Sequence, residues 1–137
     1  MRAFEGGCHC GAIHARFESD IDPERLEVRA CQCSFCVRRG MKAVSDPAGR
    51  LTLRFEDNKV HRYRFGTGMA DFLICTDCGD FIAAVSDGVG VLNVVGAAIE
   101  PFAGREATAK TFDGETNQTR AARWRAGWTP VVLEAAQ

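Results

Sequence analysis

The cysteines constrain this chain more than any other feature of its sequence. All seven lie in three short clusters: CHC at residues 8–10, CQCSFC at residues 31–36 and CTDC at residues 75–78. An odd number leaves one thiol over from a complete set of disulfides, and a bridge across a single residue would be strained. Closely spaced reduced thiols are better suited to binding a metal. The sequence therefore predicts a fold that is built around metal sites.

The remaining composition is that of an ordinary globular domain. The chain has 137 residues, of which 46% are hydrophobic and 26% charged, so we expect one zinc-binding domain over residues 1–137. A net charge of −1 gives no basic field for nucleic acid, and no apolar stretch is long enough to span a membrane. The first residues lack the apolar region of a secretory signal. We therefore expect a cytoplasmic protein, in which thiols stay reduced.

Short alternating segments predict a mainly β, sandwich-like or tent-like fold of short antiparallel strands with little helix. In residues 11–19, Ile13, Ala15 and Phe17 share one face. The other candidate strands are residues 26–31, 51–55, 60–65, 71–75, 81–86 and 91–96. Residues 51–55 and 60–65 flank a turn-like EDNK and are predicted to form a hairpin. Residues 91–96 are a candidate edge strand for pairing with a second copy, so we expect a monomer or a homodimer.

Two segments are predicted to be helical. The first is SFCVRR, directly after Cys33. The second is NQTRAARWRAG, residues 117–127, which ends at Gly127 before Thr129 and Pro130.

Seven cysteines divide naturally into four and three. Structural zinc takes four ligands, whereas catalytic zinc keeps one position open. The pairs Cys8/Cys10 and Cys75/Cys78 are each followed directly by glycine, which lets backbone N–H groups turn towards the thiolate sulfurs. A zinc shared by these pairs would close a long loop of chain. The trio lacks such a glycine, so we predict a structural four-cysteine site and an open site made of Cys31, Cys33 and Cys36.

Other interpretations of these residues remain open. A single cysteine is often only a small buried hydrophobic residue, and Cys75 and Cys78 also fit a redox CxxC motif. A histidine could complete the second site and make both sites structural, with His9, His14 and His61 as candidates.

The ordered motifs GGCHCGA, CQCSFCVRRG and ICTDCG resemble those of the glutathione-dependent formaldehyde-activating enzyme family, which includes centromere protein V-like domains. The resemblance implies a β-tent fold, related to zinc ribbons, and two zinc ions per chain. It assigns Cys8, Cys10, Cys75 and Cys78 to the closed site and the trio to the open, catalytic site. It also implies a carbon–sulfur lyase that joins glutathione to formaldehyde, giving S-(hydroxymethyl)glutathione.

Glutathione carries two carboxylates, so a cationic binding rim is expected beside the open site. The predicted contacts are Arg38 and Arg39, which follow the trio, and Arg62 and Arg64, which alternate on one strand. A solvated strand face is the competing interpretation for the second pair. Trp124, Trp128 and Phe112 could line a pocket or simply be buried in the core.

Three functions fit the sequence. The leading one is a zinc-dependent lyase that acts on a small-molecule thiol and an aldehyde. The second is a non-catalytic carrier of glutathione or another thiol. The third is an interaction module that zinc stabilises.

Overall fold

The computed structural model describes residues 1–136 and is mainly β, as predicted from the sequence. Its strands are β1 (Arg2–Gly7), β2 (His14–Ser19), β3 (Arg29–Cys31), β4 (Ala43–Val44), β5 (Arg50–Phe55), β6 (Val60–Tyr63), β7 (Asp71–Cys75), β8 (Phe81–Ser86), β9 (Val89–Asn93), β10 (Thr108–Lys110) and β11 (Thr129–Ala135). The helices are α1 (Ser34–Arg38) and α2 (Asn117–Gly127), and short 3-10 turns span Pro23–Arg25 and Asp57–Lys59. No helix in this range is long and apolar enough to cross a membrane.

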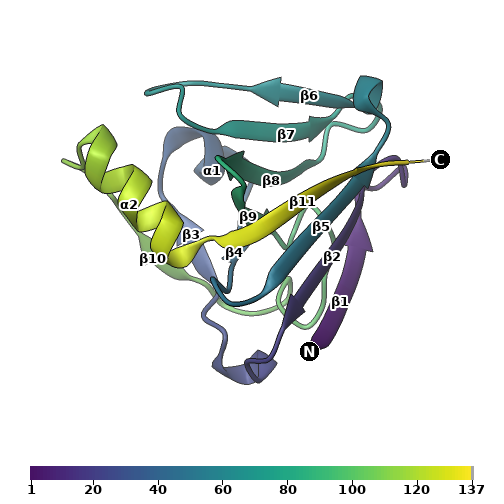
Figure 1. Ribbon diagram of the computed structural model, residues 1–137, viewed down its shortest axis with the longest axis horizontal. Helices are drawn as coiled ribbons and strands as arrows, with labels where there is room; N and C mark the ends of the chain where they lie inside the picture. Colours follow the sequence, from purple (N-terminus) through teal and green to yellow (C-terminus); the bar gives the residue numbers. More distant parts are fainter. Residues whose placement is uncertain (137) are drawn as a thin grey trace.

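The sheet divides at β9. One edge of β9 pairs with β8, and β8 continues the sheet into β7 and β6. The other edge is shared, because Val89 and Gly90 pair with β11 whereas Leu92 and Asn93 pair with β4. The sheet continues through β11 into β5, β2 and β1, and through β4 into β3 and β10. Figure 1 shows the result, with β6 and β7 at one end of the molecule and β1 and β2 at the other.

Two features of the predicted sheet are wrong. Residues 51–55 and 60–65 do not form a hairpin, because Asp57–Lys59 folds as a 3-10 turn that sends β6 to pair with β7 while β5 pairs with β2 and β11. Residues 91–96 are no edge strand, since β9 has partners on both edges. The strands are also not all antiparallel: β11 runs parallel to β5, and β10 runs parallel to β3.

The alternation in β2 explains the core beneath it. Ala15 and Phe17 are fully buried, and Ile13 just before the strand is buried with them. Phe17 packs edge-on against Phe102, and Phe4 of β1 packs against Phe102 in the same way. Burying such side chains contributes about 1.5–3 kcal/mol each. This core lies under β1, β2 and β5 and includes Cys8 and Cys75.

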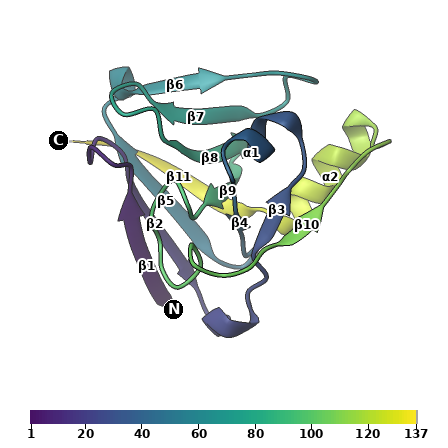
Figure 2. The ribbon, with the colours of Figure 1, turned by 180° about the vertical axis from the view of Figure 1, so that it is seen from behind.

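A second apolar cluster lies beside the helices. It joins Phe35 and Cys36 of α1, Trp124 of α2 and Trp128, and Ala84 and Val91 of the sheet. The two tryptophan rings stack with their centroids 4.4 Å apart. Figure 2 shows α2 beside β10 and β3, on the same side of the molecule as α1. This cluster therefore forms where the two helices meet the sheet.

Both helices begin as the sequence predicts. Cys33 is the N-cap of α1, and its sulfur accepts a hydrogen bond from the backbone N–H of Cys36 at 3.4 Å. Thr116 and Thr119 form a reciprocal capping box at the start of α2, which satisfies N–H groups that the helix leaves without partners. The bounds of α2 match the predicted residues 117–127.

Candidate metal centres and the adjoining cavity

The first metal centre unites the two cysteine pairs, which we call the tetrad. Cys8 and Cys10 lie in the turn after β1, whereas Cys75 ends β7 and Cys78 lies in the turn before β8. The four sulfur atoms all lie within 4.8 Å of one another. The Cys10 and Cys75 sulfurs are 3.6 Å apart, although the residues are 65 positions apart in sequence. The fold therefore brings together the two pairs that the sequence assigns to one site.

The glycines after the pairs adopt the backbone conformation that the turns require. Gly11 has φ of +84° and Gly79 has φ of +82°, in the left-handed region that residues with a Cβ rarely adopt. This conformation turns backbone N–H groups towards the sulfurs. Ile13 donates its N–H to the Cys8 sulfur at 3.2 Å. Such N–H groups offset the charge of thiolate ligands.

Asp80 links the two turns, although the sequence does not mark it as a site residue. Its carboxylate accepts a hydrogen bond from the backbone N–H of His9 at 2.7 Å and lies 3.6 Å from the Cys78 sulfur. Its backbone carbonyl accepts the N–H of Cys75 at 2.9 Å. Asp80 thus joins the Cys8/Cys10 turn to the Cys75/Cys78 turn from outside the ring of sulfurs. Its position after a Cys-Gly pair is the one sequence signal that could have identified it.

The tetrad sulfurs differ in how readily they lose a proton. Burial raises the pKa of Cys75, but the backbone N–H groups of Cys78 and Asp77 and the neighbouring thiols lower it to about 7. The N–H of Ala12 lowers the pKa of Cys10, yet desolvation and the other thiols raise it to about 12. Four thiolates this close together therefore require a cation. Four sulfur donors with N–H support fit zinc, which binds such sets tetrahedrally.

The second metal centre is the trio of Cys31, Cys33 and Cys36. Cys31 ends β3, Cys33 caps α1 and Cys36 lies in the first turn of that helix. Their sulfurs also lie within 4.8 Å of one another. Hydrogen bonds from Cys31 and Cys36 lower the pKa of Cys33 to about 2, whereas Cys31 and Cys33 raise the pKa of Cys36. The trio thus holds one negative charge readily and needs a cation to hold three.

Within residues 1–136, the tetrad and the trio are the only clusters of three or more potential metal ligands, and neither contains a histidine. His14 instead lies 3.4 Å from the carboxylate of Glu5 on the outer face of β1 and β2. The interpretation in which a histidine completes the trio therefore has no support in the geometry.

A cavity of about 350 Å³ opens onto the trio. All three cysteines of the trio line it, whereas no cysteine of the tetrad does. Trp124 and Trp128 form part of its wall, so these residues are both buried and pocket-lining. The rest of the wall comes from β3, from the β6–β7 connection, from strands β4, β7, β8 and β9, and from residues 110–113 and α2, so Phe112 also lines the cavity. A small molecule in this partly open cavity can therefore reach the thiols of the trio.

The cations beside the trio are not those that the sequence suggests. Arg29, Lys110, Arg120 and Arg123 line this cavity. Parallel pairing of β10 with β3 places Lys110 opposite Cys31, and α2 supplies the last two arginines. Lys110, Arg120 and Arg123 lie far from the trio in sequence, so no local pattern pointed to them. Arg29 lies only two residues before Cys31 on β3, so its spacing from the trio is a signal that could have identified it.

The four predicted arginine contacts lie elsewhere. Arg38 is exposed and Arg39 stacks on the Phe35 ring at 3.7 Å. Arg62 lies 3.7 Å from Asp57, and Arg64 pairs with Asp71. None of these four lines the cavity at the trio. A role for them in substrate binding remains a prediction.

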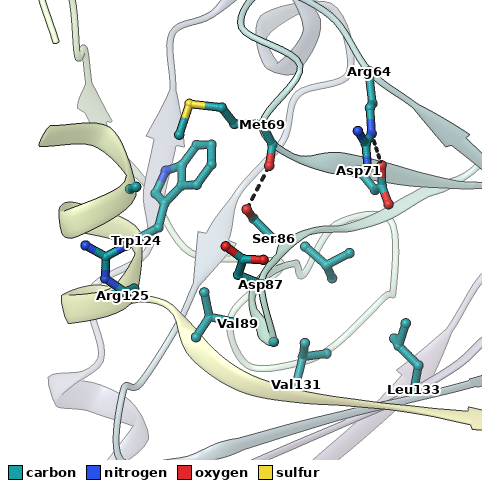
Figure 3. A pocket seen from close by; sticks show the side chains of 13 residues that line it. Arg64, Met69, Asp71, Ser86, Asp87, Val89, Trp124, Arg125, Val131 and Leu133 are labelled. Atoms are coloured by element: carbon teal, nitrogen blue, oxygen red, sulfur yellow. Dashed lines mark hydrogen bonds and ion pairs between the residues drawn. The ribbon is translucent and has the colours of Figure 1, made fainter. Parts of the chain in front are cut away.

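Arg64 instead lines a second cavity, of about 620 Å³, on the other side of Trp124. Figure 3 shows the Arg64–Asp71 pair at one side of this cavity, Trp124 and Arg125 of α2 at the other, and Asp87 between them. Ser86 donates a hydrogen bond to the Met69 carbonyl at 2.7 Å. No cysteine lines this second cavity, although it shares Met69 and Trp124 with the cavity at the trio.

The structure is thus a small, mainly β protein with two thiol-only clusters that could each hold a metal ion. A model of the family described as glutathione-dependent formaldehyde-activating enzyme matches residues 3–112, well over half of the chain. The chain therefore belongs to this family, as its motifs predict. It is also similar to the crystal structure of a Rhodobacter sphaeroides protein, with 26% identity and a TM-score of 0.59. That match covers 77% of this chain and 99% of the other.

Proposed function

We propose that the protein is a carbon–sulfur lyase that interconverts a thiol–aldehyde adduct with the free thiol and aldehyde. Glutathione and formaldehyde are the reactants that its family suggests. In the direction of synthesis, a bond forms between the thiol sulfur and the carbonyl carbon, and the thiol proton ends on the carbonyl oxygen. No oxidant or reductant is required. The reverse reaction breaks the same carbon–sulfur bond.

One observation carries this proposal: the three cysteines of the trio line a cavity that is open to solvent, whereas no tetrad cysteine lines it. Cys31, Cys33 and Cys36 would hold a zinc ion, which supplies a Lewis-acidic position that accepts a soft sulfur or a carbonyl oxygen. Three protein ligands with one open position are typical of catalytic zinc, and four are typical of structural zinc. The two thiol sets differ in this respect.

The remaining cavity residues have supporting roles in the proposal. Arg29, Lys110, Arg120 and Arg123 attract the carboxylates of a peptide-like thiol and favour its thiolate form. Trp124 and Trp128 exclude water from one wall, which protects a reversible adduct from competing hydration. The tetrad has no step of its own and holds the β1 end against the β7–β8 turn.

The test is exchange NMR of glutathione with ¹³C-formaldehyde, with and without catalytic amounts of zinc-loaded protein. We expect faster interconversion of adduct and free aldehyde than in buffer. Cys33→Ser should bring the rate back to the spontaneous value while the domain stays folded, because serine is a good N-cap and preserves the start of α1. Ser34→Ala, at the neighbouring exposed position of α1, is the matched control and should keep the acceleration.

Two results would contradict the proposal. Wild-type protein that binds glutathione without accelerating exchange would be a thiol carrier. Protein that neither binds the thiol nor accelerates exchange would be an interaction module that zinc stabilises.

A further inference from the structure

The cavity at the trio is larger and more apolar than a one-carbon aldehyde requires. Its inner wall is made of Met41, Ala43, Ala70, Ala84, Val91 and Trp128. Each of these side chains is at most 9% exposed, and together they belong to the apolar cluster at the helices. Three of them are alanines, so the space is left open by small side chains. Pockets of this volume and lining bind organic ligands with an apolar body.

Arg29 is the cation of this cavity that has no ion-pair partner among residues 1–136. Arg120 and Arg123 both pair with Glu115, at 3.4 and 2.7 Å, and Lys110 pairs with Glu27 at 3.5 Å. Within residues 1–136, no carboxylate lies at ion-pair distance from Arg29, and the closest influence is the field of Glu27. An arginine that is largely desolvated without a counter-ion is costly.

The Arg29 side chain is nevertheless held in place. Its Nη2 donates a hydrogen bond to the Ser45 hydroxyl at 2.8 Å, and that hydroxyl donates to the Gly127 carbonyl at the end of α2, also at 2.8 Å. The guanidinium has five N–H donors, so the others remain for a ligand. A fixed, uncompensated guanidinium at a cavity wall is a preformed carboxylate site.

We propose that the adduct handled at the trio carries both a carboxylate, which binds Arg29, and an alkyl or aryl group, which fills the alanine-lined wall. This inference rests on the proposed function for its chemistry but concerns the cavity itself. The apolar group belongs either to the aldehyde or to the thiol. Arg29 is thus a specificity-determining residue, and the apolar wall favours an adduct with an alkyl or aryl group over one without such a group.

Sulfur-free probes test the cavity without involving the trio. We would measure the quenching of tryptophan fluorescence by 3-phenylpropanoate, by its neutral amide and by propanoate, since Trp124 and Trp128 line the cavity. The phenyl acid should bind at least about tenfold more tightly than either comparison compound, because each of those lacks one anchoring group. Equal dissociation constants for the acid and its amide, or for the acid and propanoate, would overturn the inference.

Variants then assign the two contacts. Arg29→Gln should abolish the preference for the acid over its amide, whereas Arg29→Lys should keep part of it. Ala84→Leu should weaken the phenyl acid about tenfold without affecting propanoate, because the larger side chain occupies the wall. Arg50→Gln, at an exposed arginine outside the cavity, is the matched control. A thermal melt of each variant separates loss of binding from loss of folding.

Exchange rates measured with different thiol–aldehyde pairs identify which reactant carries the apolar group. Faster exchange of glutathione with phenylacetaldehyde than with formaldehyde places it on the aldehyde. Faster exchange of formaldehyde with 2-mercapto-3-phenylpropanoate than with glutathione places it on the thiol. Failure of both, with normal turnover of glutathione and formaldehyde, would overturn the inference and leave the proposed function intact. Binding of the probes as predicted, without turnover of any thiol–aldehyde pair, would overturn the proposed function and leave this inference intact.

Discussion

The tetrad and the trio use the same ligand atom in two different ways. The tetrad draws its sulfurs from two turns that lie 65 residues apart between Cys10 and Cys75. The trio draws its sulfurs from a single short segment, the end of β3 and the start of α1. A metal in the first set would close a long loop of chain, whereas a metal in the second would close almost none. The stabilisation that each site provides should differ accordingly.

The surroundings of the two thiol sets also fit a structural role for the tetrad and a ligand-binding role for the trio. The tetrad turns are fixed by left-handed glycines and by Asp80, and no described cavity reaches them. The trio faces a cavity with a fixed arginine and an apolar wall. One set of thiols is thus surrounded by features that stabilise a turn, and the other by features that bind a ligand.

The largest effect should follow the loss of a tetrad sulfur. Cys78→Ser should leave the domain unfolded or reduce its free energy of unfolding by several kcal/mol, because binding at structural zinc sites contributes on the order of 10 kcal/mol to folding. Circular dichroism on heating, with zinc content measured in parallel, checks this. Cys33→Ser is the comparison variant and should melt close to wild type. Equal destabilisation by the two substitutions would remove the distinction between the sites.

A smaller effect should follow substitution of a turn glycine. Gly79→Ala should cost about 1–2 kcal/mol, since its positive φ disfavours any residue with a Cβ. No atom lies within 4 Å of where that Cβ would be, so the cost is purely one of backbone conformation. Gly127→Ala is the control, because it has equal space but ends a helix without a positive φ. Urea denaturation should show Gly127→Ala to be as stable as wild type or slightly more stable. An equal loss of stability in Gly79→Ala and Gly127→Ala would disprove the explanation.

Removal of the link between the two tetrad turns should cost less. Asp80→Ala should lower the free energy of unfolding by about 1 kcal/mol, because one hydrogen bond to a charged acceptor is lost at an exposed backbone N–H. The same variant should release zinc from the tetrad faster in a chelator assay and leave release from the trio unchanged. Equal acceleration at both sites would show that Asp80 acts on the whole fold.

The smallest effect concerns the carboxylate beside the cavity cations. A hydrogen bond from Arg123 lowers the pKa of Glu115 below its ordinary value of 4.5. A lowered folded-state pKa means that this contribution is present above pH 4.5 and is lost as the pH falls through the folded pKa. Glu115→Gln should therefore cost about 1 kcal/mol or less at pH 7, since ion pairs between partly exposed surface side chains contribute little. The free energies of unfolding of wild type and Glu115→Gln, measured by denaturation at a series of pH values, should converge in acid. A difference that stays constant with pH would contradict this account.

The sequence predicted local structure well and long-range pairing poorly. Three features depend on the spacing of residues along the chain and could be predicted from it. They are the buried strand face of Ile13, Ala15 and Phe17, helix α2, and the two groups of cysteines. The parallel pairing of β11 with β5 and the separation of β5 from β6 depend on contacts between distant segments. Lys110 and Arg123 escaped prediction for the same reason, because they reach the trio only once β10 and α2 pack beside β3. Arg29 lies two residues before Cys31 and could have been predicted from the strand spacing alone.

Stepwise removal of zinc tests the central claim most directly. Zinc-loaded protein would be titrated with a chelator while native mass spectrometry counts bound ions and circular dichroism reports folding. We predict two ions per chain, of which the first leaves from the trio with no loss of structure and the second leaves only as the domain unfolds. A single ion per chain, or two ions that leave together with unfolding, would contradict the account.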